Sequence, residues 1–134
     1  MPGITNNTIK TIQFGSTASE IDDLAHKVLT GEKTATSSLH DYHLLGLKKQ
    51  CNVGDQFFIV DSTGNELATV EIVKIELRKF EDITEQFAVE EGDGSLENWL
   101  CIHWPYYSRL LAEIGKELYA DTVLVCEWFK IIEK

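Results

Sequence analysis

The stretch TGEKTATSSLHDYH, Thr30–His43, brings a lysine together with five serine or threonine side chains. Within it, Lys33 and Thr36 are the residue types that hydrolytic chemistry uses. A threonine hydroxyl can act as a nucleophile or orient water, and a lysine can be its base if burial lowers the lysine pKa toward neutrality. Side chains three apart on a regular strand point to opposite faces, so a shared site needs a bend or a lysine at the strand's very start. The alternative to a catalytic site is an ordinary solvent-exposed strand, on which the lysine only keeps the strand edge soluble.

The end of this stretch and the loop after it carry Tyr42, His43 and Lys48. An aromatic ring can stack on a base and a lysine can meet a phosphate, so these three are candidate ligand-binding residues at a cleft mouth. The same residue types suit general acid-base cleavage of RNA. His40 and His43 suggest a metal site, but no second cluster completes a tetrahedral set, so we expect no metal and no other cofactor. A polar surface loop is the alternative interpretation.

A helix is predicted directly before the lysine. The segment that ends at Gly31 carries apolar side chains at helical spacing, Thr17 and Glu20 form the pattern of a capping box, and Gly31 suits a C-cap. The chain then passes directly into EKTATSSL, where alternation and β-compatible residues predict a strand. Gly31 also makes a bend ahead of the lysine plausible.

Strands are predicted in the middle and at the end of the chain. QFFIVD and ELATVEIVKIELRKF indicate a β-hairpin around the turn STGN, and the second strand is long enough to bend. DTVLVCEWFKIIEK predicts a closing strand. Glu127 there falls on an otherwise apolar row with Val123 and Val125, so its carboxylate should need a partner.

The region between the hairpin and the closing strand is predicted to be helical. Asp82 and Glu85 match a second capping box, which predicts a short helix before the glycine-acidic loop at Glu90–Gly94. The helical pattern beyond that loop contains Pro105, which should kink the helix or divide it. We expect His103, on this helix, to pack against the sheet with its imidazole hydrogen-bonded.

Length and composition indicate one domain, residues 1–134, with its core at about 18–133. Short strands with inserted helices and no βαβ rhythm predict an α+β fold, a small mixed or antiparallel β-barrel flanked by helices.

The formal charge of -10 argues against extended DNA binding. Three cysteines without CxxC spacing indicate reduced thiols. With no signal-type segment in MPGITNNTIK and no membrane-spanning apolar run, we expect a cytoplasmic protein without a membrane partner. The oligomeric state is not predicted.

Several motifs occur in an order that resembles a known family. They are GEKTAT, VGD leading into a strand, ITEQFAVEEGDGSLENW, HW at His103 and Trp104, and VCEWF near the end. Together they resemble the ASCH domain family, small proteins with the PUA-like β-barrel fold. The likeness runs from about Leu24 to Phe129. It implies that this chain binds a nucleoside or RNA ligand in a barrel cleft.

The resemblance also implies a reaction. One small bacterial branch hydrolyses the acyl amide of N4-acetylcytidine with a lysine, a threonine three residues later and a distant glutamate. Lys33 and Thr36 match the first two positions, and the glutamate falls on Glu91, with Glu90 the alternative because the loop is one residue longer here. Other, longer members resemble ribonucleases or RNA-binding modules. The expected function is therefore amide hydrolysis of N4-acylated cytidine-like substrates, with Thr36 as nucleophile, Lys33 as base and Glu91 as orienter or acid. A metal-independent ribonuclease and a non-catalytic RNA-binding regulatory module are the alternatives.

Overall fold

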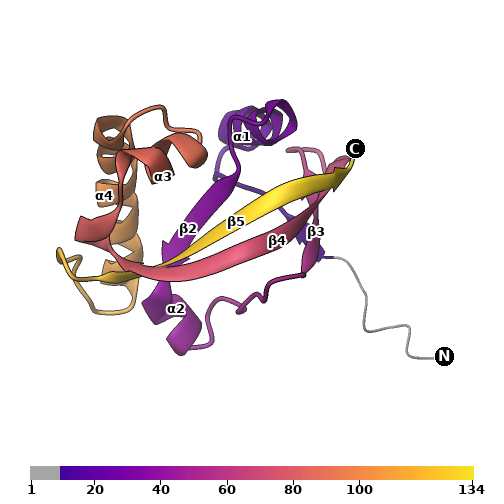
Figure 1. The fold of residues 1–134 in the computed structure, drawn as a ribbon. Coiled ribbons are helices and arrows are strands. Elements are labelled where there is room, and N and C mark those ends of the chain that lie inside the picture. The colour runs from indigo at the N-terminus through magenta and orange to yellow at the C-terminus, as the bar shows by residue number, and fades with distance from the viewer. Residues whose placement is uncertain (1–9) are drawn as a thin grey trace.

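Five strands form one curved sheet with helices packed around it (Figure 1). The computed structural model describes residues 10–134, so the N-terminal stretch that carries no signal-type pattern lies outside the described residues except for Lys10. In chain order the elements are β1 (Lys10–Ile12), α1 (Ala18–Thr30), β2 (Ala35–Leu39), α2 (His40–Leu44), β3 (Gln56–Val60), β4 (Glu66–Lys79), a 3₁₀ helix (Phe80–Asp82), α3 (Glu85–Glu90), α4 (Leu96–Glu113) and β5 (Val123–Glu133).

The strands lie in the order β1-β3-β4-β5-β2, with β1 parallel to β3 and every other pair antiparallel. The predicted hairpin is β3 and β4, and the long strand β4 also pairs with β5. Its register shifts between Ile72 and Lys74, a β-bulge that accounts for the expected bend. The sheet is a mixed half-barrel whose free edges belong to β1 and β2.

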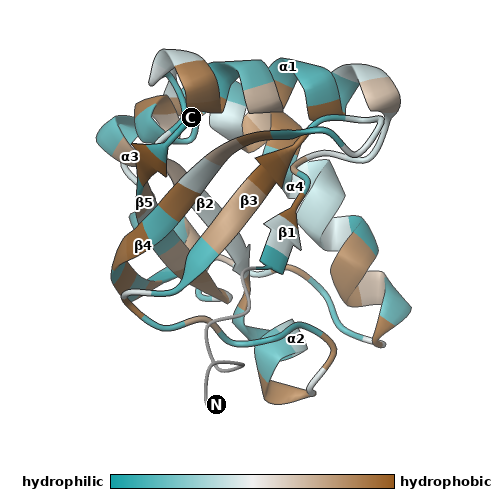
Figure 2. Ribbon diagram, turned by 90° about the vertical axis from the view of Figure 1, so that its right-hand side faces the viewer, coloured by the Kyte–Doolittle hydropathy of each residue, from teal (hydrophilic) through white to brown (hydrophobic). Residues whose placement is uncertain are grey.

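Two apolar clusters hold the helices on this sheet. One packs α3 and α4 against β2 and β5, around Phe87, Trp99 and Leu124. The other packs α1 against β3, β4 and β5, around Val28 and Ile59. The apolar residues that alternate along the strands are brown in Figure 2. Because separate clusters anchor α1 and α4, a space lined by both helices does not have to close when the core packs.

The helix predicted before the lysine is confirmed in detail. Thr17 Oγ1 accepts a hydrogen bond from the Glu20 backbone N–H, and the Glu20 carboxylate accepts one from the Thr17 backbone N–H. Gly31 ends α1 at a φ of 85°. The second predicted capping box is wrong. Asp82 lies in the 3₁₀ helix, and Thr84 caps α3 by accepting from the Phe87 amide at 3.1 Å. Burial of the residues just before Thr84 in the core sets that helix start.

The helix α4 runs through Pro105 without dividing. Proline removes one helical hydrogen bond at this point, which costs stability in an isolated helix. Four side chains spaced four residues apart, Trp99, His103, Tyr107 and Leu111, are all buried on one face of α4. Tertiary packing on both sides of the proline therefore keeps the helix continuous.

Candidate functional site

A cavity of about 630 Å³ lies where the two free edges of the half-barrel meet α1 and α4. Its volume is within the range of small-molecule sites. Both edge strands line it, as do Lys33 and Thr36 from the hydroxyl-rich stretch, Lys48 from the following loop, and Glu91. Residues widely separated in the sequence therefore share one concave site.

Local backbone geometry explains how Lys33 reaches the cavity. The left-handed Gly31 ends α1, and the Lys33 amide donates to the carbonyl of Lys27 at 3.0 Å. The next amide, of Thr34, donates to the carbonyl of Glu90 at 2.7 Å. Lys33 thus lies two residues before β2 begins, in the bend that a shared site requires, so strand alternation does not fix the direction of its side chain.

The Lys33 side chain is almost completely buried, with 4% of its surface exposed. Its Nζ donates to the carbonyls of Ala35 at 2.8 Å and Glu91 at 3.2 Å, lies 3.6 Å from Glu91 Oε1, and sits over the Phe14 ring. Burial lowers the pKa of Lys33, and the neighbouring charges of Glu91 and Asp93 oppose that shift. A neutral amine has two hydrogens, enough for both carbonyls, which leaves its lone pair free to accept a proton.

Glu91 is a buried carboxylate whose position is fixed by neighbouring side chains. Its Oε2 accepts hydrogen bonds from Ser37 Oγ at 2.8 Å and from Trp99 Nε1, and His103 Nε2 lies 3.6 Å away. Glu90 instead is half-buried and accepts from Trp128 Nε1 at 3.0 Å. Of the two glutamates left open by the sequence, Glu91 is therefore the one in the cavity.

Thr36 occupies the second position of β2, opposite Glu127 of β5. Its neighbour Ser37 points the other way, toward Glu91 and the Tyr107 hydroxyl, which is 2.6 Å from Ser37 Oγ. Strand alternation therefore assigns Thr36 to the opposite face of β2, where it lines the cavity. The cavity wraps around the free edge of β2 and meets both faces of the strand.

The three predicted ligand-binding residues separate in the structure. Lys48 lines the cavity. The Tyr42 hydroxyl donates to the carbonyl of Leu110, and its ring packs on the core of α4. His43 Nε2 is 2.9 Å from Ser38 Oγ. Neither Tyr42 nor His43 is among the cavity-lining residues, so a ligand-binding role for these two stays a prediction without support from the geometry.

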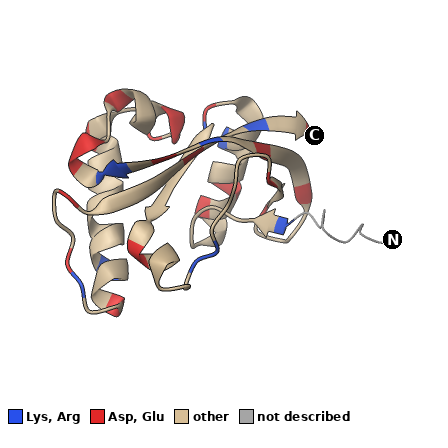
Figure 3. Ribbon diagram, turned by 60° about the horizontal axis from the view of Figure 1, so that its bottom comes forward, with Lys and Arg blue, Asp and Glu red and all other residues tan. Residues whose placement is uncertain are grey.

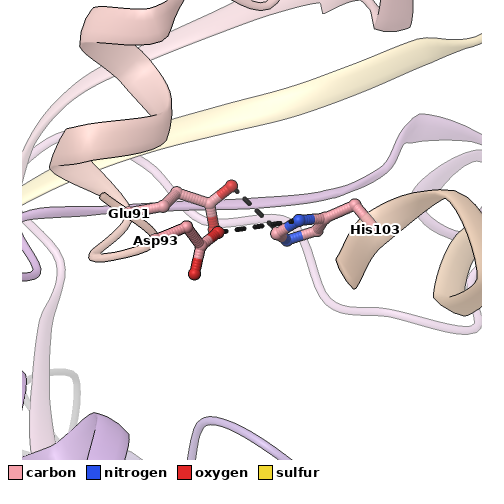
Figure 4. A group of neighbouring side chains, drawn as sticks. All are labelled: Glu91, Asp93 and His103. Carbon is pink, nitrogen blue, oxygen red and sulfur yellow. Dashed lines mark ion pairs between the residues drawn. The ribbon is translucent and has the colours of Figure 1, made fainter. Parts of the chain in front are cut away.

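His103 is a cavity residue that sequence reasoning assigned only to packing. It is buried, stacks on Trp99 with ring centroids 4.2 Å apart, and uses Nδ1 to donate to the Trp99 carbonyl at 2.9 Å. A carbonyl can only accept, so Nδ1 carries the proton and Nε2 faces Glu91. Figure 4 shows the imidazole facing the neighbouring carboxylates of Glu91 and Asp93. The only sequence signal was the buried face it shares with Trp99 and Tyr107, which looks like core.

Glu91, Asp93 and His103 could together hold a cation, since one ligand atom of each lies within 4.8 Å of the others. However, Glu91 Oε2 already accepts two hydrogen bonds and Oε1 faces Lys33 Nζ. A metal ion would have to displace these contacts. Asp93 Oδ2 is the free acceptor of the group, being buried without a hydrogen bond among residues 10–134, and burial raises the pKa of Asp93. The arrangement suits the side-chain nitrogens of Lys33 and His103 better than an ion.

Gly92 lets the Glu91 loop pass close to Lys33. Its φ is +94°, and a Cβ there would lie 3.4 Å from Lys33 Cβ and 3.3 Å from Lys27 Cδ. We expect Gly92→Ala to lower the free energy of unfolding by about 1–2 kcal/mol from backbone strain, and to displace Lys33 as well. Gly94 is the matched control, with a φ of +81° and no atom within 4 Å. Chemical denaturation should show a similar loss in the free energy of unfolding for Gly92→Ala and Gly94→Ala, whereas only Gly92→Ala should weaken ligand binding. Equal ligand binding by the two variants would contradict a role for the contact between residue 92 and Lys33.

A family model for the ASCH domain matches residues 10–133. The chain belongs to the ASCH domain family. The crystal structure of an ASCH domain from Lactobacillus crispatus is similar over 95% of this chain and 81% of that one, at 27% identity and a TM-score of 0.89. A protein from Enterococcus faecalis is similar over 92% and 76% of the two chains, at 27% identity and a TM-score of 0.83. A search of curated proteins finds no match.

These similarities confirm the predicted family and fold. This ASCH domain is a PUA-like α+β protein, with a mixed five-stranded half-barrel and helices around it. Over the part of the chain that the structure describes, no helix combines the length and the apolar character needed to cross a membrane.

Proposed function

We propose that this ASCH domain is an amidohydrolase that acts on N4-acylated cytidine-like nucleosides. The observation that carries the proposal is the burial of Lys33 against Glu91, 3.6 Å from Nζ to Oε1, in the cavity that Thr36 also lines. A buried lysine with a lowered pKa is a functional-site candidate on physical grounds alone. The family resemblance supplies the reaction, and the match is at the positions of these same three residues.

The three side chains suit distinct roles. Thr36 Oγ1 attacks the acyl carbon, and Lys33 Nζ takes the hydroxyl proton as general base. Glu91 orients Lys33 through the ion pair while Ser37 and Trp99 hold the carboxylate in place. Because Lys33 and Glu91 contact each other before a ligand arrives, little of the binding energy goes into organising this pair.

The cavity walls suit an uncharged nucleoside. Phe14, Pro105 and Tyr106 line it and offer surfaces on which a base can stack. The basic lining residues Lys27, Lys33, Lys48 and Arg109 are outnumbered by the acidic ones, Glu20, Asp23, Glu91, Asp93 and Glu127. Over the whole molecule, Lys and Arg are dispersed among several elements (Figure 3). A polyanion gains little from such a surface.

The direct test is release of acetate and cytidine from N4-acetylcytidine by the purified protein. Thr36→Val removes the hydroxyl but keeps a branched side chain that suits a strand. We expect this variant to bind substrate normally and to lose turnover by about 10²-fold or more. Thr36→Ser, which keeps the hydroxyl, is the matched control and should retain activity. Wild-type turnover that survives in Thr36→Val would exclude Thr36 as nucleophile.

The two alternative functions predict different results in the same preparation. A metal-independent ribonuclease would degrade unmodified RNA and would not depend on Thr36. A non-catalytic RNA-binding module would hydrolyse neither substrate and would bind RNA with an affinity that falls steeply with salt. Either result would overturn the amidohydrolase proposal.

A further inference from the structure

A second buried carboxylate, Glu127, lies in the cavity without a role in the proposed reaction. It is in the middle of β5, and 6% of its surface is exposed. In the strand register it stands between Thr36 of β2 and Ile75 of β4. Residues directly opposite on neighbouring strands point to the same face, with Cβ atoms about 5 Å apart. Glu127 and Thr36 therefore face the cavity as neighbours.

Among residues 10–134, the hydrogen bond that the Glu127 carboxylate accepts comes from the Cys51 thiol. Within residues 10–134, its carboxylate takes part in no ion pair and accepts no hydrogen bond from a nitrogen or oxygen donor. Lys48 and the Cys51 thiol are nearby, and Glu127 helps to raise the pKa of Cys51 to about 11. A thiol is a weak donor. A buried carboxyl group without a good partner costs stability, so its presence beside Thr36 calls for a ligand that supplies the partner.

The proposed reaction needs a proton donor for the leaving nitrogen, and Glu127 is suited to that role. The nitrogen of an amide is a poor leaving group unless it gains a proton as the bond to carbon breaks. Glu91 is committed to hydrogen bonds from Ser37 and Trp99. Burial raises the pKa of Glu127, and this outweighs the opposing effects of Cys51 and Lys48. A carboxyl group that keeps its proton toward neutral pH can serve as a general acid.

We propose that Glu127 donates the proton that releases the amine of the substrate, a role that rests on the proposed amidohydrolase function. In the first half of the reaction, Thr36 Oγ1 bonds to the acyl carbon and its proton moves to Lys33 Nζ. The carbon–nitrogen bond breaks, and the carboxyl proton of Glu127 passes to the departing nitrogen. In the second half, water adds to the acyl group and returns a proton to Glu127, while Lys33 returns its proton to Thr36. The products are a carboxylic acid and the amine.

The test compares two leaving groups in one enzyme. The nitrogen of N4-acetylcytidine must gain a proton from an acid as it leaves the acyl carbon. The 4-nitrophenolate of 4-nitrophenyl acetate is stable as an anion and leaves without an acid. Single-turnover release of cytidine and the initial burst of 4-nitrophenolate both report acylation of Thr36. We expect Glu127→Gln to slow cytidine release by about 10²–10⁴-fold. It should change the 4-nitrophenolate burst by less than about threefold.

Glutamine has the same shape as glutamate, so Glu127→Gln should fold. The pKa of Glu127 is higher in the folded protein than in the unfolded chain. As pH rises between these two pKa values, the unfolded chain loses this proton while the folded protein keeps it. The free energy of unfolding of the wild type therefore falls over that pH range. The stability of Glu127→Gln relative to wild type should therefore increase over that range. Glu133→Gln, exposed on the same strand, is the matched control and should change none of these measurements.

A pH profile gives an independent readout. Wild-type cytidine release should decline as pH rises through the raised Glu127 pKa, the phenolate burst should not, and Glu127→Gln should remove the decline. The groups facing Glu127 are Thr36 from β2, Ile75 from β4, and Lys48, Cys51 and Asp55 from the loop before β3. Burial raises the pKa of Cys51 to about 11, so the thiol keeps its proton at neutral pH.

The outcomes separate this proposal from the one it rests on. If the wild type releases neither cytidine nor 4-nitrophenolate, the amidohydrolase function fails, and the role of Glu127 fails with it. If the wild type is active but Glu127→Gln leaves cytidine release unchanged, only the Glu127 proposal is overturned. Equal slowing of both leaving groups would also overturn it, because a residue that shapes the site does not distinguish them.

Discussion

Lys33→Met should reduce hydrolysis of N4-acetylcytidine by at least about 10³-fold, because it removes the base that takes the threonine proton. Methionine fills most of the lysine volume, but it removes one partner of the buried ion pair, and a buried charge left without its partner can cost about 3–5 kcal/mol. Glu91 keeps its hydrogen bonds from Ser37 and Trp99 in this variant, which offset part of that cost. Initial rates should therefore be compared with denaturation of the same protein, and the loss of activity should persist under conditions where the variant is fully folded.

Lys130→Met is the control, because Lys130 is an exposed lysine on β5. It should retain wild-type rates. A further check is the double variant of Lys33→Met with Thr36→Val. If the two residues act as one unit, the double variant should be about as inactive as either single variant rather than multiplicatively worse. Near-normal turnover in Lys33→Met would exclude this cavity as the active site.

Glu91→Ala should have the largest effect on stability of any single change in the site. It would remove the carboxylate that pairs with Lys33 and leave the Trp99 indole nitrogen buried without its acceptor. Breaking a buried ion pair by removing one partner costs about 3–5 kcal/mol. Part of that cost is offset if Lys33 gives up its proton, since Glu91 raises the pKa of Lys33. We expect a decrease of this size in the free energy of unfolding measured with urea.

Glu90→Ala is the matched control for Glu91→Ala, because it removes a neighbouring glutamate that is only half-buried. It should lower the free energy of unfolding by about 1 kcal/mol, the contribution of one hydrogen bond from Trp128. Glu91→Gln keeps an acceptor oxygen for Trp99 and Ser37 and should fall between the two. A larger loss in Glu90→Ala than in Glu91→Ala would reverse the assignment of the site carboxylate.

Local sequence signals succeeded where neighbouring residues alone determine the structure. The helix α1 begins and ends where the sequence predicts, at the capping box of Thr17 and Glu20 and at the left-handed Gly31. Each cap uses hydrogen bonds within one turn of the helix. The same reasoning failed at Asp82 and Glu85, where a cap pattern is present but the helix begins after Thr84. A cap pattern permits a helix start there, and burial of the residues around it decides whether one occurs.

The residues of the candidate site also fall into those that the sequence alone indicates and those whose orientation depends on the fold. The family pattern alone indicates Lys33, Thr36 and Glu91, and all three line one cavity. Tyr42 and His43 are close to Lys48 in sequence, yet the short helix α2 turns the first two toward α4 and Ser38. Proximity along the chain does not determine which way a side chain points.

The sequence by itself determined the family, the α+β character of the fold, and the stretch around Lys33 that carries the proposed chemistry. These follow from motif order, periodicity and residue type, which are properties of the chain. Only the tertiary structure brought His103 to the carboxylates of Glu91 and Asp93 and placed Glu127 opposite Thr36. Helix packing and strand register join residues from different elements, and the burial that shifts their pKa values exists only once those elements have packed together.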